Sequence, residues 1–125
     1  MFFRGDLGAG KTTMIRGIVS ALPGGEEAEV SSPSFNLVNI YPTTPETAHV
    51  DLYRLEGQDP DEEVIELLQD PDRLVVVEWS ENLSLGLMPR DRVVIVLDFS
   101  GDARMARVSF FGAGTVLEKF INGLV

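Results

Sequence analysis

The stretch from Gly5 to Thr13 carries the clearest chemical signal in the sequence. It reads Gly-Asp-Leu-Gly-Ala-Gly-Lys-Thr-Thr and fits the pattern G-x-x-x-x-G-K-[ST], with Lys11 and Thr12 in the last two positions. Glycines in such a loop let successive backbone N–H groups turn toward one centre, where they bind the phosphates of a nucleotide. The lysine adds a positive charge, and the threonine hydroxyl is a ligand for Mg²⁺. The residues expected to contact the nucleotide are Asp6, Leu7, Gly8, Ala9, Gly10, Lys11, Thr12 and Thr13.

A carboxylate at the end of an apolar run is the second chemical feature. Glu78 directly follows the run from Leu74 to Val77, which is typical of a strand covered on both faces. This is where phosphate-binding-loop proteins place the acid that holds Mg²⁺ together with the loop hydroxyl. The plainer interpretation is a solvated acid at a strand end. Glu81, three residues further on, is a second candidate for the metal.

Three further side chains are candidates for the same site. Asp51 lies in a strand that is otherwise apolar at alternate positions, so its carboxylate needs a partner, which could be Mg²⁺, a catalytic water or Arg54. The alternative is an exposed aspartate on an edge strand. Trp79 follows Glu78 and is expected at the rim of the nucleotide site, with burial in the core as the alternative. We interpret His49 as a packing or hydrogen-bonding residue with no catalytic role.

The elements that position these residues follow from periodicity and turn signals. Apolar residues at helical spacing predict a helix from Lys11 to Leu22, and Asp59 with Pro60 is typical of the start of a second, short helix that ends before Pro71. A capping box at Thr115 and Glu118 predicts a final helix. Glu26 to Val30 is expected to be a loop. The predicted strands are Met1–Arg4, Phe35–Tyr41 and Ala48–Leu55 as a hairpin, Leu74–Val77, Val93–Leu97, and a half-exposed Met105–Phe111.

This order predicts an α/β fold, a three-layer P-loop NTPase-like sheet of mixed strands with helices on both faces. The 125 residues, 44% of them hydrophobic, fit a single domain. A formal net charge of -10 argues against a broad nucleic-acid surface. The absence of cysteine excludes disulfides and thiolate metal sites and agrees with a cytoplasmic location, and no apolar run is long enough to span a membrane.

Two observations narrow the nucleotide chemistry. The chain has no Asn-Lys-x-Asp motif for reading guanine, which favours ATP over GTP. The segment from Ser31 to Phe35 precedes the predicted hairpin and is either a switch that folds over the phosphates or a capped turn. No arginine is obviously placed to stabilise the transferred phosphate, although Arg16 and Arg54 are candidates.

Taken together, four blocks of sequence resemble the TsaE family, small P-loop ATPases of bacterial tRNA threonylcarbamoyladenosine biosynthesis. The blocks are Gly5–Thr13, Ser32–Asn39, His49–Leu55 and Val77–Glu81. The resemblance implies that Lys11 and Thr12 bind phosphate and Mg²⁺, that Glu78 is a metal ligand and that Asp51 arranges the metal or the hydrolytic water. It also implies that Trp79 shapes the nucleotide pocket and that Ser32 to Phe35 is the first switch.

The resemblance further implies ATP and Mg²⁺ as cofactors, TsaD and TsaB as partners, and only an indirect relation to tRNA. Family members carry a segment ahead of the P-loop strand that helps to enclose the base, and the chain from residue 1 to 125 is expected to lack it. Lys11, Asp51 and Glu78 are the expected catalytic residues, in an ATPase that is weak without its partners. The alternatives are a nucleotide-dependent interaction module without turnover, and a small-molecule kinase.

Overall fold

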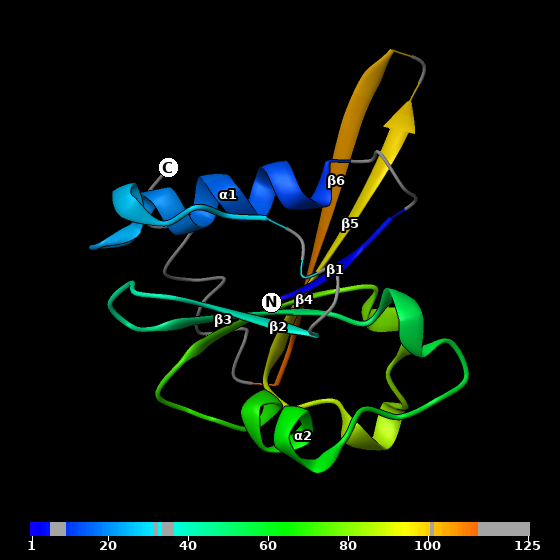
Figure 1. Cartoon of the computed structure of the whole chain (residues 1–125). Helices are drawn as coiled ribbons and strands as arrows, with labels where there is room; N and C mark the ends of the chain where they lie inside the picture. The colour runs from blue at the N-terminus through cyan, green and yellow to red at the C-terminus, as the bar shows by residue number, and fades with distance from the viewer. Residues whose placement is uncertain (6–9, 32, 34–36, 101, 113–125) are drawn as a thin grey trace.

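The protein is built around a six-stranded mixed sheet with the order β2-β3-β4-β1-β5-β6 (Figure 1). The computed structural model describes residues 1–5, 10–31, 33, 37–100 and 102–112. The strands are β1 (Phe2–Arg4), β2 (Val38–Tyr41), β3 (Thr47–Asp51), β4 (Leu74–Glu78), β5 (Arg92–Ser100) and β6 (Ala103–Phe111). In the described ranges the α-helices are α1 (Lys11–Ala21) and α2 (Glu62–Leu68), and 3-10 turns cover Gly25–Glu27, Tyr53–Leu55, Ser80–Asn82 and Leu85–Leu87.

The centre of the sheet is parallel and its two edges are antiparallel. β1 lies between β4 and β5 and runs parallel to both, and β3 is parallel to β4. The hairpin partners β2 and β6 add to the two edges in the opposite direction. The carboxyl ends of the four central strands β3, β4, β1 and β5 therefore lie at the same end of the sheet, which is where open α/β sheets bind ligands. The predicted α/β class and the mixed strands are confirmed.

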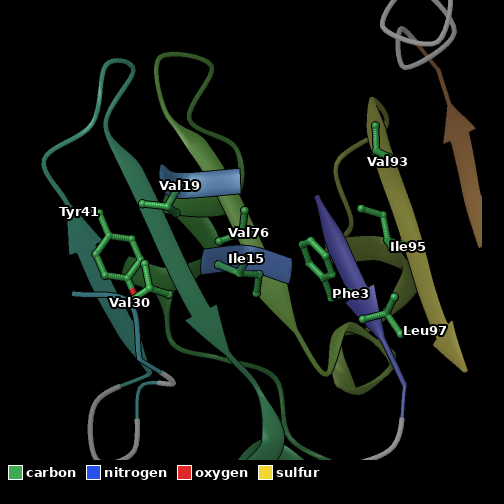
Figure 2. Close-up of a cluster of buried hydrophobic side chains, with 9 residues drawn as sticks. All are labelled: Phe3, Ile15, Val19, Val30, Tyr41, Val76, Val93, Ile95 and Leu97. Atoms are coloured by element: carbon green, nitrogen blue, oxygen red, sulfur yellow. The ribbon is translucent and has the colours of Figure 1, made fainter. Parts of the chain in front are cut away.

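Helices cover both faces of the sheet because side chains alternate along the short strand β1. Phe2 and Phe3 point to opposite faces and are 2% and 0% exposed. Phe3 packs in a cluster with Ile15 and Val19 of α1, as Figure 2 shows. Phe2 belongs to a second cluster that contains Val64 and Leu68 of α2, together with Val50, Val77 and Val94 of the sheet. Each face of the sheet thus has its own apolar core, and the predicted placement of helices on both faces is confirmed.

The second helix begins later than its sequence signals indicate. Its N-cap is Asp61, whose carboxylate accepts the N–H of Val64 at 3.2 Å, instead of Asp59 two residues earlier. The carboxylate of Asp59 accepts a hydrogen bond from the Ser84 hydroxyl, so it is held by a distant turn and does not cap α2. The helix does end before Pro71, as predicted.

Three other expectations need correction. The second strand of the first hairpin ends at Asp51, and the 3-10 turn Tyr53–Leu55 replaces its predicted last residues. Part of the expected loop after α1 forms the 3-10 turn Gly25–Glu27. On β6, Ala106 is exposed and Val108 is 45% exposed, although alternation predicts a buried side, because this strand forms the edge of the sheet. Phe35 and the helix predicted from Thr115 lie outside the described residues.

Candidate functional site

The candidate site lies where β1 leads into α1. Strand register brings three chain segments to this point, because Phe3 of β1 pairs with Glu78 of β4, and Glu78 pairs with Asp51 of β3. Gly10 caps the amino end of α1 with a φ of 100°, a left-handed conformation that glycine adopts without strain. The expected phosphate contacts Asp6, Leu7, Gly8 and Ala9 lie outside the described residues.

Lys11 is held in place although its positive charge is buried at the amino end of a helix. Its side chain is 5% exposed at the amino end of α1, where the helix dipole favours an anion over a cation. The ammonium donates to the carbonyl of Gly5, and it lies 4.0 Å from the centre of the Trp79 ring. These contacts keep the ammonium beside the loop, where a bound anion would be a far better partner.

Thr12 and Glu78 are in direct contact. The Thr12 hydroxyl donates to Glu78 Oε1 at 3.1 Å, and the Glu78 side chain is almost fully buried. A buried carboxylate is costly unless its oxygens are hydrogen-bonded. The interpretation of Glu78 as a solvated acid at a strand end is therefore wrong. Two hard oxygen donors instead meet at the carboxyl end of β4, which is the kind of ligand that Mg²⁺ prefers.

The second oxygen of Glu78 is fixed by a fully buried histidine. His49 Nε2 lies 2.7 Å from Glu78 Oε2, and its Nδ1 lies 2.8 Å from the Tyr41 hydroxyl. A carboxylate only accepts, so Nε2 carries the proton that lies between it and Glu78. The Tyr41 hydroxyl contacts both Nδ1 and the Ser31 carbonyl, the latter at 3.1 Å. The Ser31 N–H in turn lies 3.4 Å from the Tyr41 oxygen, and burial raises the pKa of Tyr41. A hydrogen-bonded line thus runs from Thr12 through Glu78 and His49 to the backbone of Ser31.

Asp51 lies beside this line and is half-buried. Its Oδ1 accepts the backbone N–H of Tyr53 at 2.9 Å. Burial raises the pKa of the Asp51 carboxyl, and the negative charge of Glu78 acts in the same direction, against the opposing effect of the Tyr53 hydrogen bond. Because β3 lies between β2 and β4, the alternative of an exposed aspartate on an edge strand is wrong. Among the described residues, one partner of Asp51 is therefore this backbone N–H.

Trp79 has a strained backbone at the centre of the site. Its φ is 57°, in the left-handed region that bulky residues rarely adopt, at a cost of about 1–3 kcal/mol. Its carbonyl accepts the N–H of Asn82, and its ring lies 5.0 Å from the ring of Tyr53. The ring packs partly against the α2-side core and lies over the Lys11 ammonium, so burial in the core applies in part. Its place at the rim of a nucleotide site stays a prediction.

Comparison with known proteins identifies the family. The family model "Threonylcarbamoyl adenosine biosynthesis protein TsaE" matches residues 1–107. This chain belongs to the TsaE family. The family that the four sequence blocks indicate is thereby confirmed.

Individual TsaE proteins and one solved structure support this result. The tRNA threonylcarbamoyladenosine biosynthesis protein TsaE of Haemophilus influenzae is 36% identical over 108 residues, which are 83% of this chain and 65% of that protein. The Streptomyces coelicolor protein of the same name is 37% identical over 98 residues, 75% of this chain and 64% of that protein. The chain therefore spans slightly less than two thirds of these relatives. The crystal structure of Bacillus subtilis YdiB superimposes with a TM-score of 0.67 and 25% identity, over 98% of this chain and 74% of that one.

The partners of His49 are what sequence reasoning missed. The interpretation of His49 as a hydrogen-bonding residue is confirmed, but its contacts with Glu78 and Tyr41 were not foreseen. Alternation along β3 places His49 and Asp51 on one face, and a β2–β3 hairpin brings Tyr41 to the same face. The signal was present in the pattern, but it required the register of β2, β3 and β4.

The remaining candidates are placed apart from this cluster. Glu81 is exposed and lines a cavity of about 300 Å³ together with residues of the turn Gly57–Asp59 and of 82–84. Arg16 donates to the carbonyl of Val30 at 3.3 Å. Ser31 and Pro33 of the expected switch are described, whereas Ser32, Ser34 and Phe35 are not. In the described part of the chain, no helix is long and apolar enough to cross a bilayer.

Proposed function

We propose that this TsaE-family chain binds Mg-ATP at the loop Gly5–Thr13 and hydrolyses it, as a P-loop ATPase that supports threonylcarbamoyl modification of tRNA adenosine. The observation that carries the proposal is the contact between Thr12 and Glu78 beside the buried Lys11. A hydroxyl from the helix start and a carboxylate from the neighbouring strand meet where a phosphate-binding loop would hold the terminal phosphates. The sequence pattern and the spatial arrangement thus point to the same chemistry.

The residues present fit Mg²⁺ held together with phosphate. Thr12 and Glu78 supply oxygen ligands, and within the described ranges no three His, Cys, Asp or Glu side chains gather to hold a metal by themselves. This suits Mg²⁺, which is usually bound by one or two protein ligands together with substrate phosphates and water. When bound, the ion neutralises charge on the phosphates and orients them. Thr12 and Glu78 would hold it, and His49 would keep the Glu78 carboxylate in a fixed orientation.

The other residues act on the phosphates and on water. Lys11 would exchange its contact with the Gly5 carbonyl for phosphate oxygens, since the charge of a phosphate attracts an ammonium more strongly than a neutral carbonyl does. Asp51, on the strand next to Glu78, would orient the attacking water. Trp79 would stay beside the phosphates and limit the access of water. The backbone N–H groups of residues 6–13 would supply the remaining phosphate contacts.

The names of the relatives support the biological setting. The proteins of H. influenzae and S. coelicolor are named for tRNA threonylcarbamoyladenosine biosynthesis. We propose that this chain acts in the same process in the cytoplasm, with TsaD and TsaB as partners, and that tRNA contacts the assembly elsewhere. The net charge of -10 fits a role without direct RNA binding.

Release of inorganic phosphate from Mg-ATP tests the proposal. We expect slow release by the chain alone, faster release when TsaB and TsaD are added, and loss of both with Lys11→Ala. Complex formation with unchanged background release would favour the interaction module. Transfer of labelled phosphate to a small acceptor would favour a kinase. Either result would contradict the proposed hydrolysis.

A further inference from the structure

An arginine from the far end of the sequence lies against the start of α1. Arg104 Nη1 is 3.0 Å, and Cζ 3.8 Å, from the position that a Cβ atom on Gly10 would occupy. Gly10 is the residue directly before Lys11 in the phosphate-binding pattern. The guanidinium is therefore next to the loop, although Arg104 is far from the loop in the sequence.

The length of the β5–β6 hairpin explains the placement. Arg4, the last residue of β1, pairs with Val96, but β5 continues to Ser100 before the chain turns back into β6. The hairpin thus extends past the point where β1 leads into the loop, and Figure 1 shows it rising beside the amino end of α1. Arg104 pairs with Phe99 near the tip of this hairpin. A shorter hairpin would place no β6 residue at the level of Gly10.

Alternation along β6 places Arg104 on the face of the sheet that α1 covers. Phe110 packs against the cluster that contains Ile15 and Val19 of α1. Arg104 is six residues from Phe110, an even spacing, so the two side chains share the α1 face of the sheet. Arg107 has the opposite parity and points to the other face. Arg104 is also exposed to solvent.

The strand order separates Arg104 from the metal-binding side of the loop. β1 lies between β4, which carries Glu78, and β5, which leads to Arg104. In the proposed function, Thr12 and Glu78 on the β4 side would hold Mg²⁺ and the terminal phosphates. The α-phosphate and the nucleoside would then lie on the other side of β1, toward the β5–β6 hairpin. Arg104 is placed for this end of the nucleotide and lies away from the phosphate that is transferred.

We propose that Arg104 binds the nucleoside monophosphate portion of the bound nucleotide. The inference rests on the proposed function. A guanidinium donates in a fork to phosphate oxygens and also stacks on flat rings, so it suits both the α-phosphate and the attached purine. This contact exists equally in ATP and ADP. Arg104 thus adds to ground-state affinity for both nucleotides and contributes little to the hydrolytic step itself.

Calorimetry with four proteins tests whether Arg104 binds this portion of the nucleotide. It measures their affinities for Mg-ATP and Mg-ADP. The proteins are the wild type, Arg104→Ala, Arg104→Lys and Arg107→Ala, which removes the same charge from the opposite face of the same strand. We expect Arg104→Ala to weaken both nucleotides by about tenfold, because it removes an exposed charge-assisted contact. Arg104→Lys should lose less, and Arg107→Ala should stay within about twofold of the wild type. At saturating ATP, the phosphate release rate of Arg104→Ala should stay close to that of the wild type.

The possible outcomes separate this inference from the proposed function. Equal affinities for Arg104→Ala and Arg107→Ala would overturn the inference while nucleotide binding by the wild type stands. A loss that affects ATP but not ADP, or a lower release rate at saturation, would place Arg104 at the terminal phosphate and would also overturn it. If the wild type binds neither nucleotide, the proposed function fails first. Thermal unfolding of all four proteins checks whether the substitutions leave the fold intact.

Discussion

The two sides of β1 differ sharply in how they hold polar groups. On the β4 side, His49 and Glu78 are 0% and 3% exposed and are joined by a 2.7 Å contact that continues to Thr12 and Tyr41. On the β5–β6 side, a long hairpin carries exposed side chains such as Met105, which is 59% exposed, and brings Arg104 to the loop. One side is fixed by burial, whereas the other is open to solvent.

The difference between the two sides follows from what each would do in nucleotide binding. A metal-binding carboxylate must hold its orientation before the ligand arrives, and buried hydrogen bonds to a rigid ring achieve this at the cost of desolvating a charge. A contact to the nucleoside end adds affinity by attraction alone, so an exposed arginine is sufficient. We therefore expect substitutions on the buried side to change turnover and stability, and those on the open side to change affinity alone.

Glu78→Gln should lower phosphate release more than any other substitution on the buried side of β1. The amide keeps the shape of the side chain but removes the charge, so the release of phosphate should fall on the order of 10²–10³-fold. Glu81→Gln is the matched control, since Glu81 is exposed and lines a separate cavity. Phosphate release by both variants, with TsaB and TsaD present, is the measurement. Equal effects of the two substitutions would contradict the distinction between these acids.

His49→Leu should have the next largest effect. Loss of the Nε2 contact frees the Glu78 carboxylate to rotate, and removal of such a supporting residue typically costs about 10–100-fold in metal affinity or activity. The measurement is the Mg²⁺ concentration that gives half-maximal phosphate release. His49→Gln, whose amide N–H can replace Nε2–H, should restore much of the loss. A His49→Leu protein that folds and shows an unchanged Mg²⁺ requirement would show that the histidine is only structural.

Tyr41→Phe tests the far end of the hydrogen-bonded line that runs from Thr12 through Glu78 and His49. The substitution leaves Nδ1 of the buried His49 without its hydroxyl partner, which should cost about 1–2 kcal/mol of unfolding free energy. Denaturant unfolding gives this value directly. Tyr53→Phe is the control, because the Tyr53 side chain is 49% exposed and no hydrogen bond of its hydroxyl contributes to the buried line. A loss of equal size in both variants would be inconsistent with the proposed line.

Asp51→Asn should give the smallest change in stability, and this change should be a gain. The pKa of Asp51 is raised above its ordinary value of 3.8, so the folded state favours the protonated form. Asp51 therefore contributes to the free energy of unfolding below its ordinary pKa, and this contribution is lost as the pH rises through the raised pKa. At pH 7 the ionised carboxylate lowers the stability of the fold. The substitution should therefore raise Tm at pH 7 by about 1–3 °C.

The gain should vanish in acid, where Asp51 itself is protonated, and phosphate release should fall at all pH values because the asparagine orients water less well. Asp72→Asn, on an exposed turn, should leave Tm unchanged. A lower Tm for Asp51→Asn at pH 7 would show that the ionised carboxylate stabilises the fold and would contradict the expected cost of its charge.

These results also show what the sequence could and could not predict. Elements with a local cause were predicted well, such as α1 with its glycine-rich start and β4 with its continuous apolar run. The start of α2 was misplaced because Asp59 bonds to Ser84, a residue that is distant in sequence. The contact of Glu78 with His49, like the approach of Arg104 to Gly10, depends on strand register and hairpin length, which single-sequence patterns do not specify.

Calorimetric titration of Mg-ATP into the wild-type chain and into Lys11→Ala measures whether the loop Gly5–Thr13 binds the nucleotide. We expect a single site in the wild type, weaker binding when EDTA removes the metal, and an affinity reduced by about a hundredfold or more in the variant. Equal affinities of the two proteins, or binding by the wild type that is indifferent to Mg²⁺, would contradict the proposed binding of Mg-ATP at this loop.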